Sequence, residues 1–502
     1  MTKNVFLRSQ RMQYYAVYTV VFTVLVFVVF QWSIFYGKTF LWYADGLNLH
    51  NPALIYVAKY FRRIIRTLLL SHRLIIPQWD FNIGEGSDIL QAQHYTMMGN
   101  PFSLLSVLVP SRYMYWYYGA MVLAQLYIAG IFFSWLCFYT GKKNRCAILS
   151  GSITYVFSYW AMYNAVRHAC FLVPIVWFPL IILGVEKILK CDKPYTFIIA
   201  VACAAFSNFY FFYVQALVAI LYTCVRLLLK YGKKVCSMLW IFFKLFLFAV
   251  CGLGIAAVIL LPVLYIFISD FRRGGASHLL AYPLNYYLRI PSLLFSPIDS
   301  FWLCLCSSSP AVLAVYCLFC KKKSLLLRIL FIFCVVIILS PLLGALLNGM
   351  SYRTNKWSWA FILLSAYTLV DEWGTMRNLK ITELFFFFLF FLIYVSILLF
   401  SNKLVYSIAE AKRIALVIIL QLYILGLFIV LLKSMPIGMP KTCLCLLFVG
   451  LSLFFNAFFK FSSNQGAYSN ELATPKEAAA ILDNETRDIK KARKADASQS
   501  DS

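Results

Sequence analysis

Residues 14–36 read YYAVYTVVFTVLVFVVFQWSIFY, a predominantly apolar run without a charged side chain. A helix of about 20 apolar residues crosses the roughly 30 Å hydrocarbon core of a bilayer. Comparable runs recur along the chain, which predicts an all-α polytopic membrane protein with about thirteen transmembrane helices. The further predicted spans are 113–140, 146–165, 169–188, 194–207, 209–229, 238–269, 303–320, 325–347, 357–373, 382–401, 413–432 and 441–460.

The composition supports the same class. Of the 502 residues, 62% are hydrophobic and 13% are charged, whereas soluble domains carry about a quarter charged residues. Soluble enzymes, nucleic-acid-binding proteins and disulfide-stapled secreted domains are therefore excluded. The 15 cysteines lie mostly within or beside apolar runs, so buried free thiols are expected.

The net charge of +26 comes mainly from short basic clusters between the apolar runs. Such clusters mark the cytoplasmic side of a membrane protein. With the clusters inside, residues 1–13 are cytoplasmic, residues 14–460 form the membrane domain, and residues 37–112 form a large first extracellular loop. The tail at 461–502 lies outside and is predicted to be disordered, because it is polar and charged. The clusters are Lys142–Arg145, Lys187–Lys193, Lys230–Lys234, Lys321–Lys323 and Arg377–Lys380.

The first predicted loop is unusually acidic for this chain, and Asp45 is its first carboxylate. It follows the first span closely, within the segment Trp42-Tyr43-Ala44-Asp45-Gly46. A carboxylate near headgroup level among aromatic residues is partly desolvated, and desolvation makes it a stronger base. The alternative is that Asp45 caps the next helix or hydrates the loop, as isolated aspartates often do.

An amphipathic helix is predicted shortly after Asp45. Lys59, Arg62, Arg63 and Arg66 recur at helical spacing and form a basic stripe. Such a helix is too charged to span, so it is expected to lie in the outer interface with its apolar face in lipid. It serves either as a strut or as an attractor for lipid phosphates. Its apolar face is formed by Val57, Phe61, Ile64, Ile65 and Leu68.

A glycine-rich turn follows, in which Gly84 and Gly86 flank Glu85 and precede Asp88. A turn of this kind presents carboxylates and backbone amides together, and it can hold sugar hydroxyls or a divalent cation. His94 is a candidate polar contact nearby. The histidines lack the spacing of a zinc motif, so no metal site is predicted.

Several of these features together resemble one family. They are Asp45-Gly46 after the first span, a loop with Trp79, Gly84, Gly86 and Asp88 that ends at Asn100-Pro101-Phe102, and a later stretch from Asn348-Gly349 through Arg353, Lys356 and Trp357. The pattern is similar to that of the YfhO family of bacterial membrane proteins, polytopic glycosyltransferases of the GT-C type. Members usually carry a sizeable extracellular domain after the spans, whereas here a polar tail follows.

The resemblance implies transfer of a sugar from a polyprenyl-phosphate donor to a cell-surface glycan acceptor, such as a teichoic-acid-like polymer. In GT-C enzymes an aspartate in the first outer loop is the catalytic base, and Asp45 is the matching position. Glu85 and Asp88 are then expected to contact an acceptor hydroxyl or a cation. The partners implied are the donor, the acceptor and the lipid bilayer, without nucleic acid.

A departing lipid phosphate requires cations aimed at its oxygens. Arg353 and Lys356 at an outer span end are the first candidates, and Arg272 and Arg273 beside Gly274-Gly275 are the reserve. Each basic pair has the alternative of being a snorkelling anchor at the interface. Trp357 is a candidate for stacking on a sugar ring, although interfacial belts contain tryptophan in any case.

Two other classes of function remain open. A flippase or transporter of lipid-linked sugars would carry ionisable residues at mid-membrane depth and interrupted helices. An outer-leaflet glycan polymerase or ligase would use the same lipid carrier and depend on outer-loop arginines. The acids of this chain gather in the first loop instead, which favours chemistry at the membrane surface.

Overall fold

The computed structural model describes residues 2–84, 86–269, 281–400, 404–434, 439–461 and 471–480. These residues are almost entirely helical, with one two-stranded hairpin in which Trp79 and Asp80 pair with Asp88 and Ser87. The prediction of an all-α polytopic membrane protein is therefore confirmed. The elements are α1 (Thr2–Val29), α2 (Gln31–Phe35), η1 (Gly46–His50), α3 (Asn51–Ser71), β1 (Trp79–Asp80), β2 (Ser87–Asp88), α4 (Ile89–Gln93), α5 (Pro101–Leu104), η2 (Leu105–Leu108), η3 (Ser111–Tyr113), α6 (Met114–Tyr139), α7 (Arg145–Val156), α8 (Tyr159–Arg167), η4 (Ala169–Leu172), α9 (Val173–Leu189), α10 (Tyr195–Ser207), α11 (Phe209–Tyr231), α12 (Val235–Ser269), α13 (Leu284–Leu293), α14 (Ser309–Lys321), α15 (Leu325–Leu339), α16 (Pro341–Leu346), α17 (Trp359–Glu372), η5 (Met376–Asn378), α18 (Ile381–Phe400), α19 (Ile408–Ser434) and α20 (Met439–Phe461).

The number of membrane-crossing helices is only partly settled by length and composition. Among the described residues, 8 helices are long and apolar enough to cross a membrane, and α10, α14 and α15 are shorter apolar helices. The predicted spans at 146–165 and 357–373 correspond to α7–α8 and to α17, which belong to neither group. The predicted count of thirteen is therefore not confirmed.

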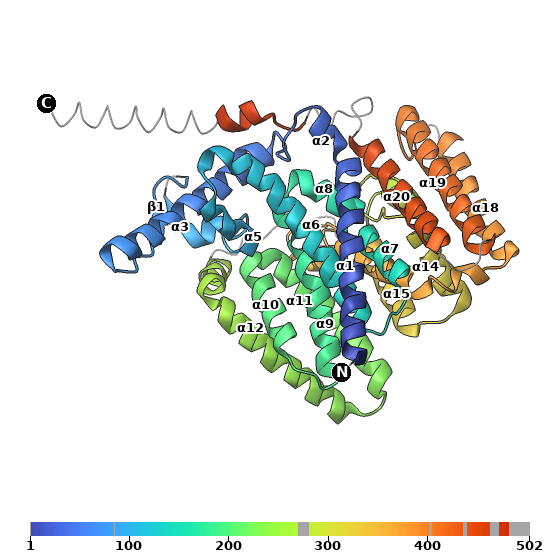
Figure 1. The fold of residues 1–502 in the computed structure, drawn as a ribbon, viewed down its shortest axis with the longest axis horizontal. Coiled ribbons are helices and arrows are strands. Elements are labelled where there is room, and N and C mark those ends of the chain that lie inside the picture. Colours follow the sequence, from blue (N-terminus) through green and yellow to red (C-terminus); the bar gives the residue numbers. More distant parts are fainter. Residues whose placement is uncertain are drawn as a thin grey trace.

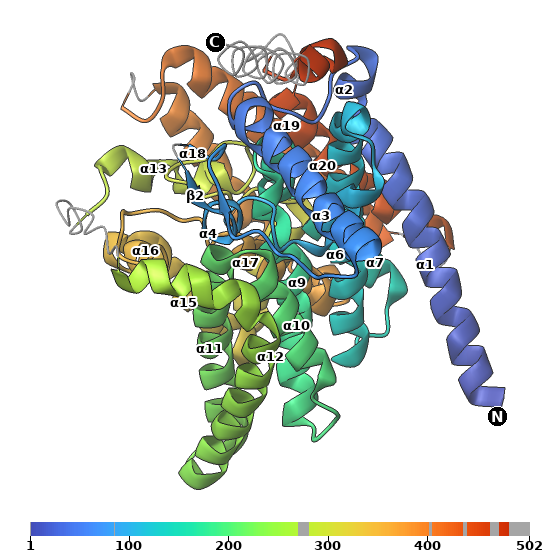
Figure 2. The same cartoon turned by 90° about the vertical axis from the view of Figure 1, so that its left-hand side faces the viewer.

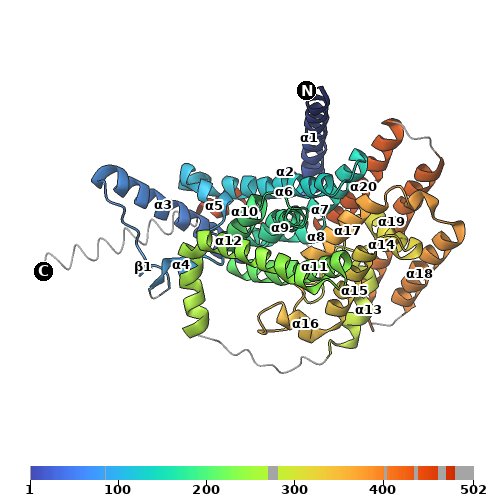
Figure 3. The ribbon, with the colours of Figure 1, turned by 90° about the horizontal axis from the view of Figure 1, so that it is seen from below.

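The long connections gather at one end of the bundle, here called the loop face. Figure 1 shows α2, α3 and the hairpin at the end opposite the N-terminus, together with the described part of the C-terminal tail. Seen along the bundle, α9 lies in the middle, with α10 and α12 on one side and α18 and α19 on the other (Figure 3). The span that includes α9 is fully enclosed by other helices.

Two predicted spans are interrupted near the loop face by serine caps, and the span at 14–36 also breaks, at Phe30 between α1 and α2. The span at 146–165 breaks at Ser158, whose side chain accepts a hydrogen bond from the Ala161 amide at 3.4 Å and so starts α8. The span at 325–347 breaks at Ser340, which caps α16 in the same way. Serine before a helix stabilises a new N-terminus and ends the preceding helix. The close pair α10 and α11 is separated by Asn208, which caps α11.

The predicted amphipathic helix is observed as α3, which runs across the loop face (Figure 2). Its surroundings differ from the prediction, because Val57 and Ile64 are buried against the protein, whereas Ile65 and Leu68 are exposed. Arg62 of the basic stripe donates its Nε to the carbonyl of Val107 at 2.8 Å. The first half of the helix is thus packed on the bundle, and only its second half presents apolar side chains outward.

Part of the tail is ordered, contrary to the prediction of disorder for 461–502. Leu472 forms an antiparallel bridge with Trp42, and the amide of Thr39 donates to the carbonyl of Ala473 at 2.8 Å. Leu472 and Ala473 are buried. The segment 471–480 therefore packs beside the start of the first loop, and we call it the tail segment.

The tight packing of α9 gives a test of the helix arrangement. A Cβ at Gly184 would lie 2.6 Å from the Cα of Phe197 in α10, whereas a Cβ at Gly426 in α19 would meet nothing within 4 Å. Because backbone atoms cannot move aside cheaply, Gly184→Ala is expected to destabilise the fold by about 1–3 kcal/mol. Gly426→Ala is the matched control and should leave stability unchanged or slightly higher. The melting temperature Tm in one detergent measures both, and equal shifts would contradict this packing.

Candidate active site

A group of ionisable side chains meets at the loop face, and we call it the Asp45 cluster. Its members come from distant parts of the chain. Asp45 directly precedes η1, His50 ends η1, Arg167 ends α8, His168 follows it, and Lys356 precedes α17. The cluster exists because α8 ends at the loop face instead of continuing as part of a longer span. Its members are Asp45, His50, Arg167, His168 and Lys356.

The Asp45 carboxylate is available for chemistry. Its side chain is 52% exposed, and Oδ2 lies 3.8 Å from Nδ1 of His168. Although Asp45 directly precedes η1, its side chain makes no capping hydrogen bond. No hydrogen bond to this carboxylate is formed within the described residues, so the helix-cap alternative for Asp45 does not hold in this structure. An exposed carboxylate that accepts no hydrogen bond from the protein is suited to accept a proton from a substrate.

His50 and His168 form a neutral pair behind the carboxylate. Nε2 of His50 lies 3.1 Å from Nδ1 of His168, and Nδ1 of His50 is buried without a partner in the described part of the protein. An unpaired buried N–H is costly, which favours the tautomer in which His50 carries its proton on Nε2 and donates to His168. Burial lowers the pKa of His50 to about 4 and that of His168 to about 3. Both rings are therefore uncharged at neutral pH.

The neutral pair makes the fold sensitive to acid. The unfolded chain binds protons near the ordinary histidine pKa of about 6.5, whereas the folded pair resists protonation down to pH 3–4. This contribution to stability is thus fully present above pH 6.5 and is lost as the pH falls below it. Each histidine should cost about 2 kcal/mol between pH 7 and pH 5. We expect Tm in detergent to fall over this interval.

A His168→Gln variant should lose part of this pH dependence, because its amide does not titrate. His72→Asn at the exposed end of α3 is the control, and asparagine tolerates the left-handed conformation found there. An identical pH dependence of Tm in His168→Gln and in the parent protein would contradict the neutral-pair assignment.

Lys356 is a buried cation in an aromatic cage. Only 8% of the residue is exposed, and its Nζ donates to the hydroxyl of Tyr352 at 2.8 Å. No carboxylate of the described residues lies within ion-pair distance of this ammonium group. Its Nζ also lies 5.2–5.4 Å from four ring centres, those of Phe171, Tyr210, Trp302 and Tyr352. Cation–π contacts of about 0.5–2 kcal/mol offset only part of the cost of burying a charge.

The aromatic residues join Lys356 to the histidine pair. The ring of Phe171 stacks on His168 at 4.8 Å, and the ring of Trp302 lies 5.7 Å from the same imidazole. Both rings also belong to the cage around Lys356. The positive charge of Lys356 contributes to the lowered pKa of His168. The carboxylate of Asp45 therefore lies beside an imidazole whose ring neighbours, Phe171 and Trp302, also surround the ammonium group of Lys356.

Arg167 ties the cluster to the tail segment. Its guanidinium donates to the hydroxyl of Tyr163 at 2.9 Å and pairs with the carboxylate of Glu471 at 3.2 Å. The same group stacks over the ring of Trp42 at 4.6 Å. Arg167 thus has protein partners on several sides, and it holds the segment that precedes Asp45 against α8.

Two residues predicted near Lys356 do not join the cluster. The guanidinium of Arg353 stacks over Tyr282 and Phe301, and it donates to the carbonyl of Ala281 at 3.0 Å. Trp357 is 2% exposed, and its indole N–H donates to Asn355 at 3.1 Å. Buried in this way, Trp357 does not offer the predicted stacking face on the outer surface.

The acids and the histidine that follow α3 have structural partners. Asp88 accepts a hydrogen bond from the Gln91 amide at 2.9 Å and caps α4. His94 is buried, and its Nε2 donates to the carbonyl of Phe206 at 2.9 Å, which anchors the loop to the end of α10. Neither side chain is brought to Asp45.

Glu85, Arg272 and Arg273 lie outside the described residues. In the described part of the chain, no three histidine, cysteine or acidic side chains are grouped so as to hold a metal ion.

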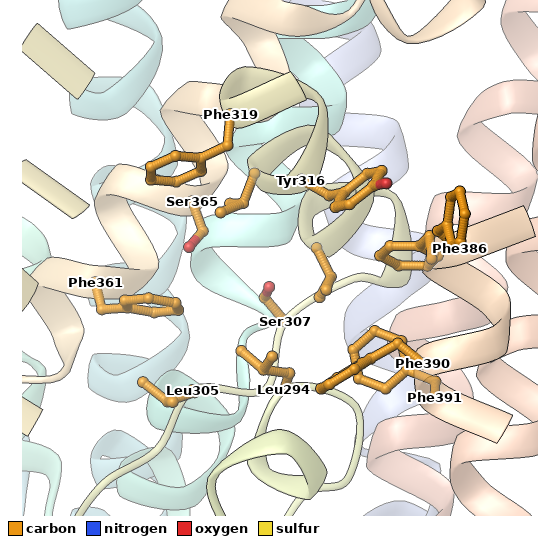
Figure 4. Close-up of a pocket in the computed structure, with 13 residues that line it drawn as sticks. Leu294, Leu305, Ser307, Tyr316, Phe319, Phe361, Ser365, Phe386, Phe390 and Phe391 are labelled. Atoms are coloured by element: carbon orange, nitrogen blue, oxygen red, sulfur yellow. The ribbon is translucent and has the colours of Figure 1, made fainter. Parts of the chain in front are cut away.

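Two largely apolar cavities lie near the cluster. One has a volume of about 390 Å³ and is lined by Leu305, Ser307 and Phe361, with phenylalanines of α18 opposite (Figure 4). Leu305 is three residues from Trp302 of the lysine cage, at most about 11 Å along the chain. The other has a volume of about 230 Å³ and extends along α17 from Trp357, the neighbour of Lys356.

Comparison with known proteins places the chain in a family. The family model described as "Bacterial membrane protein YfhO" matches residues 13–499. The chain belongs to the YfhO family. Within this family, YfhO of Bacillus subtilis (strain 168), described as uncharacterized, is 28% identical over 255 residues, which make up 51% of this chain and 29% of that relative. The matched region thus spans less than a third of the relative's length.

One solved structure was also matched. The crystal structure of ArnT from Cupriavidus metallidurans bound to undecaprenyl phosphate aligns with a TM-score of 0.44 and 12% identity, over 89% of this chain and 76% of that chain. A likeness at this level does not establish a shared fold. The family match and the apolar helices together make this YfhO-family chain a multi-pass membrane protein.

Sequence reasoning on this YfhO-family chain missed the residues around Asp45. His50 and His168 were not expected at the site, because no histidine spacing marks them. Arg167-His168 directly before an apolar span was the available signal, since ionisable residues at that position lie at a membrane boundary. The aromatic cage of Lys356 could not be read from the sequence, because its rings come from segments far apart in the chain.

Proposed function

We propose that this protein is a GT-C-type glycosyltransferase that moves a sugar from a polyprenyl-phosphate carrier to a cell-surface glycan on the outer face of the membrane, such as a teichoic-acid-like polymer. The observation that carries the proposal is that two groups of opposite charge lie around His168. Lys356 is a buried cation without a carboxylate partner among the described residues, and Asp45 is a half-exposed carboxylate that accepts no hydrogen bond from them. The cation suits an anionic leaving group, and the carboxylate suits a reacting hydroxyl.

Lys356 provides the phosphate contact. A buried ammonium group without a carboxylate partner gains most from an anionic ligand, because charge-assisted hydrogen bonds strengthen where water is excluded. The carrier phosphate gains negative charge as its bond to the sugar breaks. An ammonium group already fixed in an aromatic cage stabilises that charge without having to reorganise.

Asp45 provides the base. As the acceptor oxygen attacks the anomeric carbon, its proton passes to a carboxylate oxygen of Asp45, the bond between the sugar and the carrier phosphate breaks, and the polyprenyl phosphate leaves. The neutral histidines beside Asp45 matter here, because a charged imidazolium would hold the carboxylate in an ion pair and make it a weaker base.

The isoprenoid chain of the carrier needs an apolar binding cavity. One of the two cavities described above is lined by Leu305, three residues after Trp302, and the other by Trp357, which directly follows Lys356. Either cavity offers an isoprenoid chain largely apolar walls, and the second also reaches the ion pair of Glu186 and Arg226. In the orientation set by the basic clusters, the N-terminus is cytoplasmic, and the loop face and the tail are extracellular.

The proposal is tested with purified protein in liposomes. Radiolabelled sugars are offered as their polyprenyl phosphates, together with a polyol-phosphate polymer as acceptor. Label appearing on the acceptor supports a transferase. Label that crosses the bilayer on its carrier without reaching the acceptor would favour the flippase, and label joined into chains without acceptor would favour the polymerase. Either of these results would overturn the proposal.

A further inference from the structure

A polar cavity opens at the loop face beside the Asp45 cluster, and Tyr163 contacts both Arg167 of the cluster and Lys460 of the cavity. Its volume is about 220 Å³, several times the roughly 30 Å³ that one water molecule occupies. Residues of α8, α13, α19 and α20 line it, and we call it the basic pocket because three of its side chains are cationic. The charged and aromatic lining consists of Tyr159, Arg289, Asp299, Tyr406, Glu410, Arg413, Phe459 and Lys460.

Two arginines are fixed on its wall by backbone carbonyls. Nε of Arg289 donates to the carbonyl of Val405 at 3.0 Å, and its guanidinium stacks over the ring of Tyr406 at 4.5 Å. Arg413 donates one terminal nitrogen to the carbonyl of Phe459. Carbonyl oxygens orient a guanidinium group, and an arginine stays protonated, so both side chains contribute positive charge to the pocket wall.

The third cation, Lys460, lies against tyrosines. Its Nζ donates to the hydroxyl of Tyr159 at 3.0 Å and lies 5.2 and 4.9 Å from the ring centres of Tyr159 and Tyr163. The hydroxyl of Tyr159 also donates to Oδ1 of Asp299 at 3.4 Å, a long contact. Lys460 thus adds a third positive charge to the same wall.

The two carboxylates of the pocket lie at its rim. Asp299 and Glu410 are both exposed, whereas the three cations are half-buried. Glu410 is committed to the start of α19, where Oε2 accepts from the amide of Ser407 at 3.2 Å and from its hydroxyl at 2.8 Å. The interior of the pocket is therefore more positive than its mouth.

We propose that the basic pocket binds a phosphate ester. Two guanidinium forks and one ammonium group around one cavity match the several oxygens of a phosphate, which arginine binds through paired N–H donors. Exposed carboxylates at the rim suit hydroxyl groups of the esterified alcohol. The phosphate belongs either to a soluble polyol phosphate or to a lipid headgroup, since both present the same group.

The position of the pocket suggests the role of this ligand. Tyr159 at the pocket and Arg167 at the Asp45 cluster are eight residues apart on α8, about 12 Å of helix rise. This spacing fits an acceptor whose reacting hydroxyl lies near Asp45 while a neighbouring phosphate of the same molecule lies in the pocket. That role rests on the proposed function, whereas phosphate binding itself does not.

Binding is measured on the full chain in phosphatidylcholine nanodiscs, by equilibrium dialysis with radiolabelled glycerol 3-phosphate and without any sugar donor. In a second arm, nanodiscs containing phosphatidic acid test whether a lipid phosphate displaces the label. We expect saturable binding that Arg289→Gln and Arg413→Gln each weaken at least tenfold. Lys412→Gln, which removes an exposed cation of α19 outside the pocket lining, is the matched control and should bind like the parent.

A second measurement uses the parent protein, so that a variant that fails to fold cannot be mistaken for one that fails to bind. Saturating glycerol 3-phosphate should shield Arg289 and Arg413 from phenylglyoxal modification, as read by mass spectrometry. If neither phosphate binds saturably, or if Lys412→Gln weakens binding as much as the pocket variants, the proposal is overturned. Asp45→Asn should bind glycerol 3-phosphate normally, so a failed transfer reaction and a failed pocket are separable results.

Discussion

Replacement of Asp45 by asparagine is expected to lower sugar transfer by roughly 10²- to 10⁴-fold, the usual contribution of a general base. Asparagine keeps the shape of the side chain and removes its capacity to take a proton. Because no hydrogen bond of the described residues ends on this carboxylate, the exchange should leave Tm nearly unchanged. The measurement is the initial rate of label transfer in liposomes at matched protein content.

A second loop aspartate supplies the control. Asp80 accepts hydrogen bonds from the Tyr56 hydroxyl at 2.7 Å and from the Asn82 amide at 2.9 Å. Although partial burial raises the pKa of Asp80, these hydrogen bonds outweigh it and hold that pKa below its usual range. Asp80→Asn should therefore disturb the loop slightly and retain transfer. Full activity of Asp45→Asn would remove Asp45 as the base and direct attention to Asp88 or Glu85.

Replacement of Lys356 by methionine is expected to separate activity from stability. Loss of one charge-assisted phosphate contact of about 1.5–3 kcal/mol should lower kcat/KM by roughly 10- to 100-fold. Methionine has a similar length and is apolar, so it fits the cage of aromatic rings. Removing a buried charge that has no carboxylate partner should hold or raise Tm. The two measurements are transfer kinetics against donor concentration and thermal unfolding.

Arg353→Met is the comparison for this variant, because Arg353 lies on the same connection but faces Tyr282 and Phe301. Its kcat/KM should change by less than about threefold if it makes no contact with the donor. A lower Tm for Lys356→Met together with unchanged kinetics would show that the lysine is structural, and the phosphate contact would then have to be sought elsewhere.

The membrane class and most of the helix positions could be predicted, because hydrophobic length is a local property. Runs such as 113–140 and 209–229 must be helices wherever lipid replaces water, since the backbone finds its hydrogen bonds only within the segment. Ser158 and Ser340 show where this reasoning fails. Each caps a new helix inside an apolar run, and hydropathy does not record a capping hydrogen bond.

Of the candidate site, Asp45 and Lys356 are brought to one imidazole, and the other described candidates are not. Asp88 and His94 were predicted from residue type and loop position. In the structure Asp88 instead caps α4, and His94 donates to the backbone carbonyl of Phe206. Whether each side chain makes such a local contact or faces the site cannot be decided from the sequence. The histidine pair and the aromatic cage depend on contacts between distant segments, and these contacts follow only from the three-dimensional packing.

The bridge between Trp42 and Leu472 sets an order of events during synthesis. These two residues are separated by nearly the whole membrane domain, so the first loop waits for its partner until α20 has left the ribosome and entered the bilayer. Non-local closure of this kind is slow and comes late in assembly. Glu471 reaches Arg167 in the same step. A nascent chain interrupted before this point has the Asp45 carboxylate but not the segment that packs beside it, so newly made protein should mature only after residues 471–473 have left the ribosome.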